Sequence, residues 1–230
     1  WSPCAPMLAA CRLISEQPVE PGAVGLCFRK TARLMRSVGA LVLAAGLSRR
    51  FGTDKRRALL PTGESVIEAT LTHLTRAFGD VHVVLREEDD ELHELIRTRF
   101  PETTLSHCPT AHLGMGHSLA HGAQFAESWD GVAICLADMP YTRVETLEAL
   151  IGHFQSLKDD RAILIPTFHG DRGHPVLFGR DYLHDMAQLT GDQGARRIIE
   201  AHPEYVHIFI SEDTGILGDI DRPGDLDRTH

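Results

Sequence analysis

An apolar run that leads into a basic, glycine-containing loop is the first stretch of the sequence that could carry out chemistry. The run covers residues 39–45 and has the length of a buried parallel strand. Gly46 and Gly52 follow it and bracket a pair of arginines, and Lys55 lies three residues further on. Small residues let a backbone approach a ligand closely, and cations favour an anionic ligand. The loop predicts a phosphate-binding site at the carboxyl end of the first strand, although a solvated basic turn would have the same composition.

The spacing of this loop separates it from two common phosphate-binding motifs. A Walker loop has four residues between its glycines and a lysine directly after the second. Here five residues separate Gly46 from Gly52. A dinucleotide-binding fingerprint needs a third glycine at the start of a helix, and none stands at that spacing. Any phosphate must be bound by another geometry.

A carboxylate at the end of a second apolar run is the next candidate. Residues 132–137 have the pattern of a buried strand, Asp138 follows at once, and Pro140 fixes the turn behind it. A carboxylate in this place suits a divalent cation. Asp138 could instead cap the next helix, but Thr142 is the better cap for a helix that begins near residue 143. We therefore interpret Asp138 as a metal ligand.

Two further carboxylates lie near the end of the chain. Asp219 and Asp221 alternate about Ile220, so both point the same way in an extended chain. One of them could complete a Mg²⁺ site whose other ligands are phosphate oxygens and water. Taken alone, the segment is better explained as an acidic, solvated turn. Together with the basic loop and Asp138, it makes up the apparatus of phosphoryl or nucleotidyl transfer, in which catalysis rests on positioning and charge neutralisation.

The composition limits the ligands that such a site could bind. The chain has 230 residues, a net charge of −9 and a pI near 5.8, which argues against a general nucleic-acid binder. Five cations nevertheless crowd into residues 49–57, a pattern that favours a small polyanion. The five cysteines form no C-x-x-C pair, so neither a disulfide framework nor a zinc site is predicted. No run is long and apolar enough to span a bilayer.

Strand-like and helix-like segments alternate from residue 38 onward, and they predict the elements that position these groups. The expected strands are residues 39–45, 81–85, 104–107, 131–137, 162–166, 175–178 and 205–210. The expected helices are residues 65–78, 89–100, 117–127, 143–157 and 192–201. Ser65 and Glu68 have the spacing of a capping box for the first helix. This alternation predicts an α/β domain with a mostly parallel sheet covered on both faces, in which ligands bind beyond the carboxyl ends of the strands.

Residues 1–37 differ from the rest of the chain. They hold three of the five cysteines and show no sustained periodicity, so we expect a disordered N-terminal extension before one domain at 38–230. No compact apolar core precedes a small-residue cleavage site, which argues against a secretory signal. We therefore expect a cytoplasmic protein.

Six short motifs, in this order along residues 40–226, resemble the MobA-like nucleotidyltransferases. The basic loop reads Leu-Ala-Ala-Gly-x-Ser-x-Arg-Phe-Gly-x-x-Lys over residues 43–55. The later motifs are Gly-Met-Gly-His-Ser-Leu at 114–119, Asp-Met-Pro at 138–140, Gly-His-Pro-Val at 173–176, Gly-Asp-Gln-Gly-Ala-Arg at 191–196 and Asp-Ile-Asp-x-Pro-x-Asp-Leu at 219–226. The resemblance implies an enzyme with the three-layer α/β/α Rossmann-like fold that this family shares with sugar-phosphate nucleotidyltransferases and methylerythritol-phosphate cytidylyltransferase.

Within that family, the motifs at residues 173–176 and 191–196 are most similar to the molybdenum cofactor cytidylyltransferases. The guanylyltransferase branch tends to have Leu-Ala-Gly-Gly in the first loop, whereas this chain has Ala45 before Gly46. A methyl group there narrows the space beside the base, which favours a pyrimidine. The resemblance therefore implies Mg²⁺-dependent transfer of CMP from CTP to the terminal phosphate of molybdopterin, with release of pyrophosphate.

The resemblance also implies roles for individual residues. The catalytic groups would be Lys55, which neutralises charge at the α-phosphorus, Arg50 on the triphosphate, and Asp138. Mg²⁺ would be held by Asp138 together with Asp221 or Asp219. The nucleotide would be bordered by Ala44, Ala45, Gly46, Leu47, Ser48, Gly52, Gly116 and Ser118. The pterin would be bordered by Gly173, His174, Gly191, Asp192, Gly194 and Arg196.

The sequence departs from the family pattern at two places. Lys55 is followed by Arg56 and Arg57, where the cytidylyltransferases place apolar residues sooner. These cations could serve a more anionic acceptor, or they could lie in a surface-exposed widening of the loop. Residues 110–112 read Thr-Ala-His, which departs from the polar pattern often seen before the turn at Gly114, where the base is selected.

Two other functions stay open. GTP or another nucleotide could replace CTP, and another small phosphorylated molecule could be the acceptor. A non-catalytic carrier of nucleotide or cofactor would predict a broken metal site or a missing lysine, and Asp138 and Lys55 are both present. The expected partners are CTP, molybdopterin and a molybdenum hydroxylase that receives the cofactor. Neither nucleic acid nor a membrane is expected.

Overall fold

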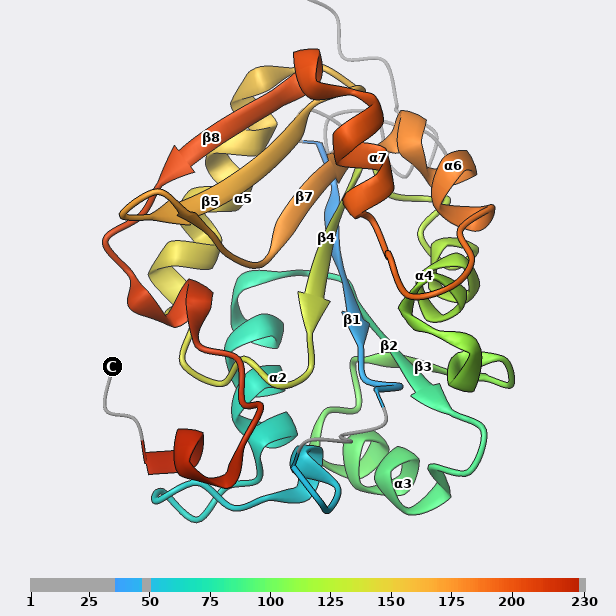
Figure 1. The fold of residues 1–230 in the computed structure, drawn as a ribbon, viewed down its shortest axis with the longest axis vertical. Helices are drawn as coiled ribbons and strands as arrows, with labels where there is room; N and C mark the ends of the chain where they lie inside the picture. Colours follow the sequence, from blue (N-terminus) through green and yellow to red (C-terminus); the bar gives the residue numbers. More distant parts are fainter. Residues whose placement is uncertain (1–35, 47–50, 228–230) are drawn as a thin grey trace, which may run out of the picture. The chain divides into compact units, whose positions relative to one another are not determined.

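An eight-stranded, mostly parallel sheet organises the residues that the computed structural model describes, which are 36–46 and 51–227 (Figure 1). The strands run in the order β3-β2-β1-β4-β7-β5-β6, and β8 pairs with β5. The parallel part contains β1 (Val38–Leu43), β2 (Val81–Arg86), β3 (Thr104–Cys108) and β4 (Gly131–Leu136). The remaining strands are β5 (Ile163–Phe168), β6 (Asp171–Arg172), β7 (Val176–Gly179) and β8 (Val206–Ile210). Of these, β7 is antiparallel to both β4 and β5, whereas β8 is parallel to β5.

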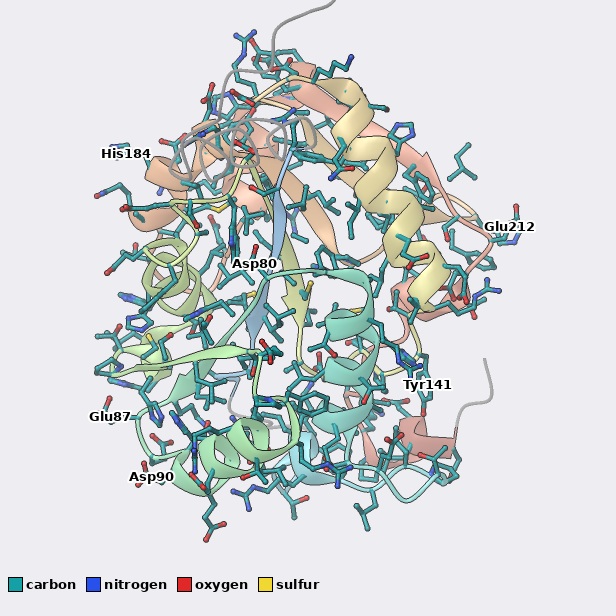
Figure 2. The ribbon with its side chains drawn as sticks, turned by 180° about the vertical axis from the view of Figure 1, so that it is seen from behind. Asp80, Glu87, Asp90, Tyr141, His184 and Glu212 are labelled. Carbon is teal, nitrogen blue, oxygen red and sulfur yellow. The ribbon has the colours of Figure 1, made fainter. Side chains whose placement is uncertain are left out.

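Helices cover both faces of this sheet, so the predicted three-layer α/β/α fold is confirmed. One face packs against α2 (Val66–Ala77), α3 (Asp90–Arg99) and α5 (Val144–Leu157), which lie in front of the strands in Figure 2. The other face packs against α4 (Met115–Ala123), α6 (Leu183–Ala187) and α7 (Arg196–Ala201). Along β1, Ala40 and Val42 belong to the first core and Leu41 and Leu43 to the second, as the alternation of a strand requires. In the described part of the chain, no helix is long and apolar enough to cross a membrane.

The expected strands and helices are all present, and the strand ends lie within two residues of the predictions. The capping box is confirmed, because the Ser65 side chain accepts from Glu68 N while the Glu68 side chain accepts from Ser65 N. Two helices differ at their ends. Helix α4 begins at residue 115, directly after Gly114 with its φ of 126°, and α7 begins at 196 rather than 192. The sequence prediction missed α6 and β6, which are too short to show a period.

Residues 1–35 lie outside the described residues, and so does nearly all of the predicted N-terminal extension. Its last two residues, Arg36 and Ser37, are described. Arg36 Nη1 donates to the Asp159 carbonyl at 3.1 Å, and Ser37 N donates to Asp130 Oδ2 at 3.1 Å.

The first turn of α5 is capped from a distant loop, and the prediction that Thr142 caps it is wrong. Thr142 Oγ1 donates instead to the carbonyl of Gly215 at 3.1 Å. The buried Asp213 accepts from Arg143 N at 2.9 Å, from Thr146 Oγ1 at 2.8 Å and from Gly215 N at 2.9 Å. Thr142 has the local signal of a cap, whereas the carboxylate that fills this role comes from far along the chain. It ties the start of α5 to the loop that leads into the C-terminal segment.

We predict that Asp213→Ala lowers the free energy of unfolding by about 2–4 kcal/mol, because it leaves buried donors without an acceptor. Urea denaturation measures the change. The matched control is Glu212→Ala, because the Glu212 side chain is exposed and lies at the edge of the molecule in Figure 2. This control should shift stability by no more than about 0.5 kcal/mol. Equal stability of the two variants would contradict the capping role of Asp213.

Candidate active site

A cavity of about 530 Å³ opens at the carboxyl ends of β1 and β4. These strands are neighbours, but β1 pairs with β2 on its other side whereas β4 pairs with β7. The cavity therefore lies at the point where the strand order reverses, the place at which open α/β sheets bind ligands. Nine residues that the sequence singles out line it: Ala44, Ala45, Gly46, Lys55, Ser118, Asp138, Asp192, Asp219 and Asp221. Segments that are far apart in the sequence thus meet at one end of the sheet.

Lys55 lies between two carboxylates in this cavity. Its Nζ forms an ion pair with Asp138 Oδ2 and a second with Asp221 Oδ1 at 3.3 Å. Burial alone would lower the pKa of Lys55, but Asp138 and then Asp221 outweigh it and raise the pKa. The ammonium group is therefore charged at neutral pH, and it faces the cavity beside the end of β4.

The two C-terminal carboxylates are brought to β4 by a buried residue between them. Ile220 is fully buried, and its N–H donates to the Asp138 carbonyl at 3.0 Å. Asp225 Oδ2 accepts from Asp221 N at 3.0 Å and holds the turn from the other side. Burial raises the pKa of Asp219, and the neighbouring Asp138 and Asp221 raise it further. Negative charge is thus concentrated at the place where the sequence predicts a metal.

The oxygens around Lys55 fit a divalent cation. Within residues 36–46 and 51–227, no cluster of three or more His, Cys, Asp or Glu side chains is arranged to hold a metal ion. Asp138 and Asp221 nevertheless share one cation, the Lys55 ammonium, so both carboxylates point at a common position. Mg²⁺ is commonly bound by one or two carboxylates together with substrate phosphates and water. The donor set suits a metal that arrives with a nucleotide.

An apolar wall completes the cavity. It contains Ala111, Leu113 and Met115, of which Leu113 is 50% exposed and Met115 is 46% exposed. Exposed apolar side chains beside a polar site are suited to contact a planar heterocycle. The sequence prediction did not assign these three residues to the site, because only the fold reveals which apolar side chains line the cavity.

Two glycine-containing motifs, at residues 114–119 and 191–196, contact each other. Gly116 N donates to the Gly191 carbonyl at 2.7 Å. A Cβ at Gly114 would lie 2.4 Å from Asp192 Oδ1, and the φ of 126° at this residue also favours glycine. The motifs at 114–119 and 191–196 therefore contact each other directly. Gly116 and Gly191 join the turns rather than line the cavity.

Leu47, Ser48 and Arg50 lie outside the described residues. Several other residues that the sequence predicts for the site are described and do not line the cavity. Arg196 is exposed, and its Nε donates to Glu200 Oε1 at 2.7 Å. His174 lines a separate cavity of about 20 Å³, and burial lowers its pKa. The others are Gly52, Gly173 and Gly194.

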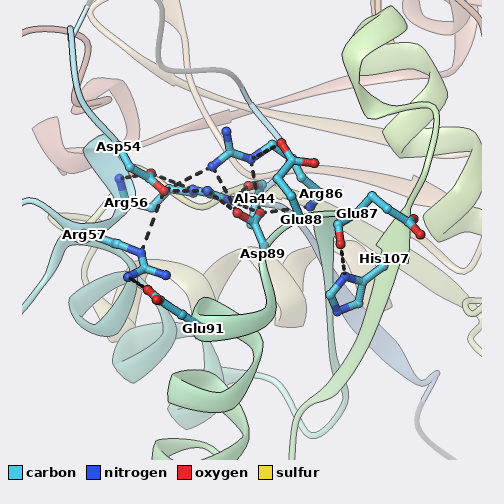
Figure 3. A network of polar contacts seen from close by, with 10 residues as sticks. All are labelled: Ala44, Asp54, Arg56, Arg57, Arg86, Glu87, Glu88, Asp89, Glu91 and His107. Carbon is cyan, nitrogen blue, oxygen red and sulfur yellow. Dashed lines mark hydrogen bonds and ion pairs between the residues drawn. The ribbon is translucent and has the colours of Figure 1, made fainter.

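The two arginines after Lys55 have different surroundings, which corrects our interpretation of them as a pair. The Arg57 side chain is 43% exposed, and its Nη1 donates to Glu91 Oε2 at 2.8 Å, as in a surface-exposed loop (Figure 3). Arg56 is only 2% exposed and bonds to protein oxygens. Arg56 is therefore neither surface-exposed nor available to bind an anionic acceptor, the two alternatives that the sequence suggested. Its partner Asp89 lies beyond β2, where loop composition gives no signal of the contact.

Comparison with known proteins agrees with this architecture. Residues 40–206 match the MobA-like NTP transferase domain family. The chain is 33% identical over 195 residues to the purine catabolism protein PucB of Bacillus subtilis (strain 168), covering 80% of this chain and 92% of that protein. It is 24% identical over 203 residues to a probable molybdenum cofactor guanylyltransferase of Natranaerobius thermophilus, covering 84% and 94%.

A solved structure shares the fold. Rv0371c of Mycobacterium tuberculosis H37Rv, in complex with manganese, has a TM-score of 0.61 and 19% identity, covering 77% of this chain and 89% of that one. The family match includes the basic loop, the Asp138 turn and the glycine turns, so the resemblance that these motifs carry is confirmed. The protein is a nucleotidyltransferase, and its chain belongs to the MobA-like NTP transferase family.

Proposed function

We propose that this nucleotidyltransferase transfers CMP from CTP to the terminal phosphate of molybdopterin and releases pyrophosphate. The observation that carries the proposal is the position of Lys55 between Asp138 and Asp221, in a cavity that also contains the backbone of residues 44–46. This arrangement supports the proposal, because one fixed cation and two carboxylates face the same cavity as that backbone. Catalysis would then rest on positioning and on neutralising charge.

The reaction requires neither a protein nucleophile nor a strong general base. An oxygen of the acceptor phosphate attacks the α-phosphorus of the nucleotide and forms a new P–O bond. The bond between the α-phosphorus and the bridging oxygen to the β-phosphate breaks, and its electron pair leaves with pyrophosphate. No proton has to be removed, because the acceptor phosphate is already anionic at neutral pH.

Each side chain of the site has one task in this proposal. Lys55 stabilises the charge that builds on the oxygens around the α-phosphorus, while the backbone N–H groups near Ala45 and Gly46 orient the nucleotide. Asp138 and Asp221, with Asp219 beside them, would hold Mg²⁺. A bound Mg²⁺ would supply further neutralisation of the triphosphate.

The choice of base and acceptor rests on separate observations. Ala45 is 3% exposed and lines the cavity, and it carries a methyl group where the Leu-Ala-Gly-Gly loop has glycine. This supports CTP. A relative named as a probable molybdenum cofactor guanylyltransferase favours GTP as the second candidate, and it also supports a molybdopterin acceptor. The finished cofactor would pass in the cytoplasm to a molybdenum hydroxylase. A purely non-catalytic carrier would not need the charged Lys55 between two carboxylates.

The first test is pyrophosphate release by the purified protein with Mg²⁺ and molybdopterin, with CTP, GTP, ATP and UTP offered separately. We expect release with CTP only. Release with GTP only would support nucleotidyl transfer to molybdopterin but contradict the choice of CTP that rests on Ala45. No release with any of the four, while a known enzyme uses the same molybdopterin, would contradict molybdopterin as the acceptor.

The second test removes the two groups at the centre of the proposal. Lys55→Ala and Asp138→Asn should each lower kcat by about 100-fold or more, because the first removes the cation beside the reacting phosphate and the second removes a carboxylate that would hold Mg²⁺. Circular dichroism and thermal unfolding verify that both variants are folded. Arg57→Ala is the control, since its exposed side chain does not line the cavity. If either variant turned over like this control, the mechanism would be wrong.

A further inference from the structure

Arg56 is a buried arginine whose hydrogen bonds are all satisfied inside the protein. Its Nε and Nη2 donate to the two oxygens of Asp54 at 2.8 and 2.6 Å. Its Nη2 and Nη1 also donate to the two oxygens of Asp89, the first at 2.7 Å, and Nη1 donates to the Ala44 carbonyl at 2.6 Å (Figure 3). These contacts use all five N–H groups of a guanidinium. Arg56 touches the cavity wall but offers no free donor to a phosphate.

A second arginine balances the charge of this cluster. Arg86 Nη2 lies 3.1 Å from Asp54 Oδ2, and Arg86 Nε donates to Asp89 Oδ2 at 3.2 Å. Arg86 N donates to the same Asp89 oxygen at 3.0 Å, which fixes this carboxylate at the end of β2. Two cations thus face two carboxylates, so the cluster adds no net charge to the site in front of it. Because Asp89 is buried, removing one partner would leave a charge without compensation.

The cluster connects the two parts of the site that must be held in register. Ala44 N donates to Val84 O at 3.0 Å, and Ala44 O accepts from Arg56, so the backbone that enters the nucleotide loop is fixed from both sides. Arg56 also directly follows Lys55 in the short 3-10 helix Lys55–Arg57, which Asp54 caps. One guanidinium therefore links the Ala44 carbonyl to the residue that carries the ammonium group.

We infer that Arg56 is a positioning residue, which holds Lys55 in register with the nucleotide loop at residues 44–46. The catalytic consequence of this inference rests on the proposed function. The clamp, by which we mean the contacts of Arg56 with Ala44, Asp54 and Asp89, is a structural claim. A lysine at this position would keep the charge and lose the planar fork, so it could not contact Ala44, Asp54 and Asp89 together. The nucleotide would still bind to the loop, whereas Lys55 would stand in the wrong place during the transfer.

The test compares Arg56→Lys with Arg57→Lys, two neighbouring substitutions of the same type, one buried and one exposed. Steady-state kinetics are measured with the nucleoside triphosphate that the wild type uses, Mg²⁺ and molybdopterin, well below the unfolding temperature. We expect Arg56→Lys to lower kcat by about 10- to 100-fold, with KM for the nucleotide changed by less than about threefold. Arg57→Lys should match the wild type in both constants.

Amide hydrogen exchange of residues 43–46 and 55–58 provides a readout that does not depend on activity. Exchange should be faster in Arg56→Lys and unchanged in Arg57→Lys. If Arg56→Lys does not fold, Asp54→Asn takes its place in the test. This substitution removes the carboxylate charge that faces Arg56, and the Asp54 side chain is partly exposed. Unchanged exchange in the folded clamp variant would overturn the inference, as would an unchanged kcat. If the wild type transfers no nucleotide but exchange is faster in Arg56→Lys as expected, the proposed function is refuted and the clamp is supported.

Discussion

The parallel pairing of β1 with β4 is the constraint on which the site depends. Its register places Leu43 beside Leu136, so the residues that follow both strands emerge at one edge of the sheet. Residues 44–46 continue from β1, and Asp138 follows β4. A hydrogen bond from Ile220 N to the Asp138 carbonyl then brings the C-terminal carboxylates to the same edge. The topology of the sheet therefore forms the cavity, and residues of the short sequence motifs line it.

The three cations of residues 55–57 have three different surroundings. The Lys55 ammonium faces the cavity between two carboxylates, and those carboxylates keep it charged. Arg56 points inward and is neutralised by Asp54 and Asp89. Arg57 points outward to the exposed Glu91. The three cations at residues 55–57 are thus not a single positive patch, because Arg56 is paired inside the protein and Arg57 at its surface, while Lys55 faces the cavity.

The sequence predicted those features whose signals are local. Strand periods located the sheet, and a carboxylate directly after a buried strand located Asp138 at the cavity. The alternation about Ile220 placed Asp219 and Asp221 on one side. Contacts that depend on distant residues could not be predicted in this way. The cap of α5 comes from Asp213, seventy residues beyond Arg143, and the partner of Arg56 comes from Asp89, thirty-three residues away.

A crystal structure with Mn²⁺ and a non-hydrolysable CTP analogue would test the central claim most directly, because anomalous scattering locates the metal independently of the protein. We predict a manganese peak coordinated by Asp138 and Asp221 and by phosphate oxygens of the analogue. The Lys55 ammonium should then lie against the α-phosphate, and Arg56 should keep its contact with the Ala44 carbonyl. A metal bound elsewhere, or a nucleotide outside the cavity between β1 and β4, would contradict the account.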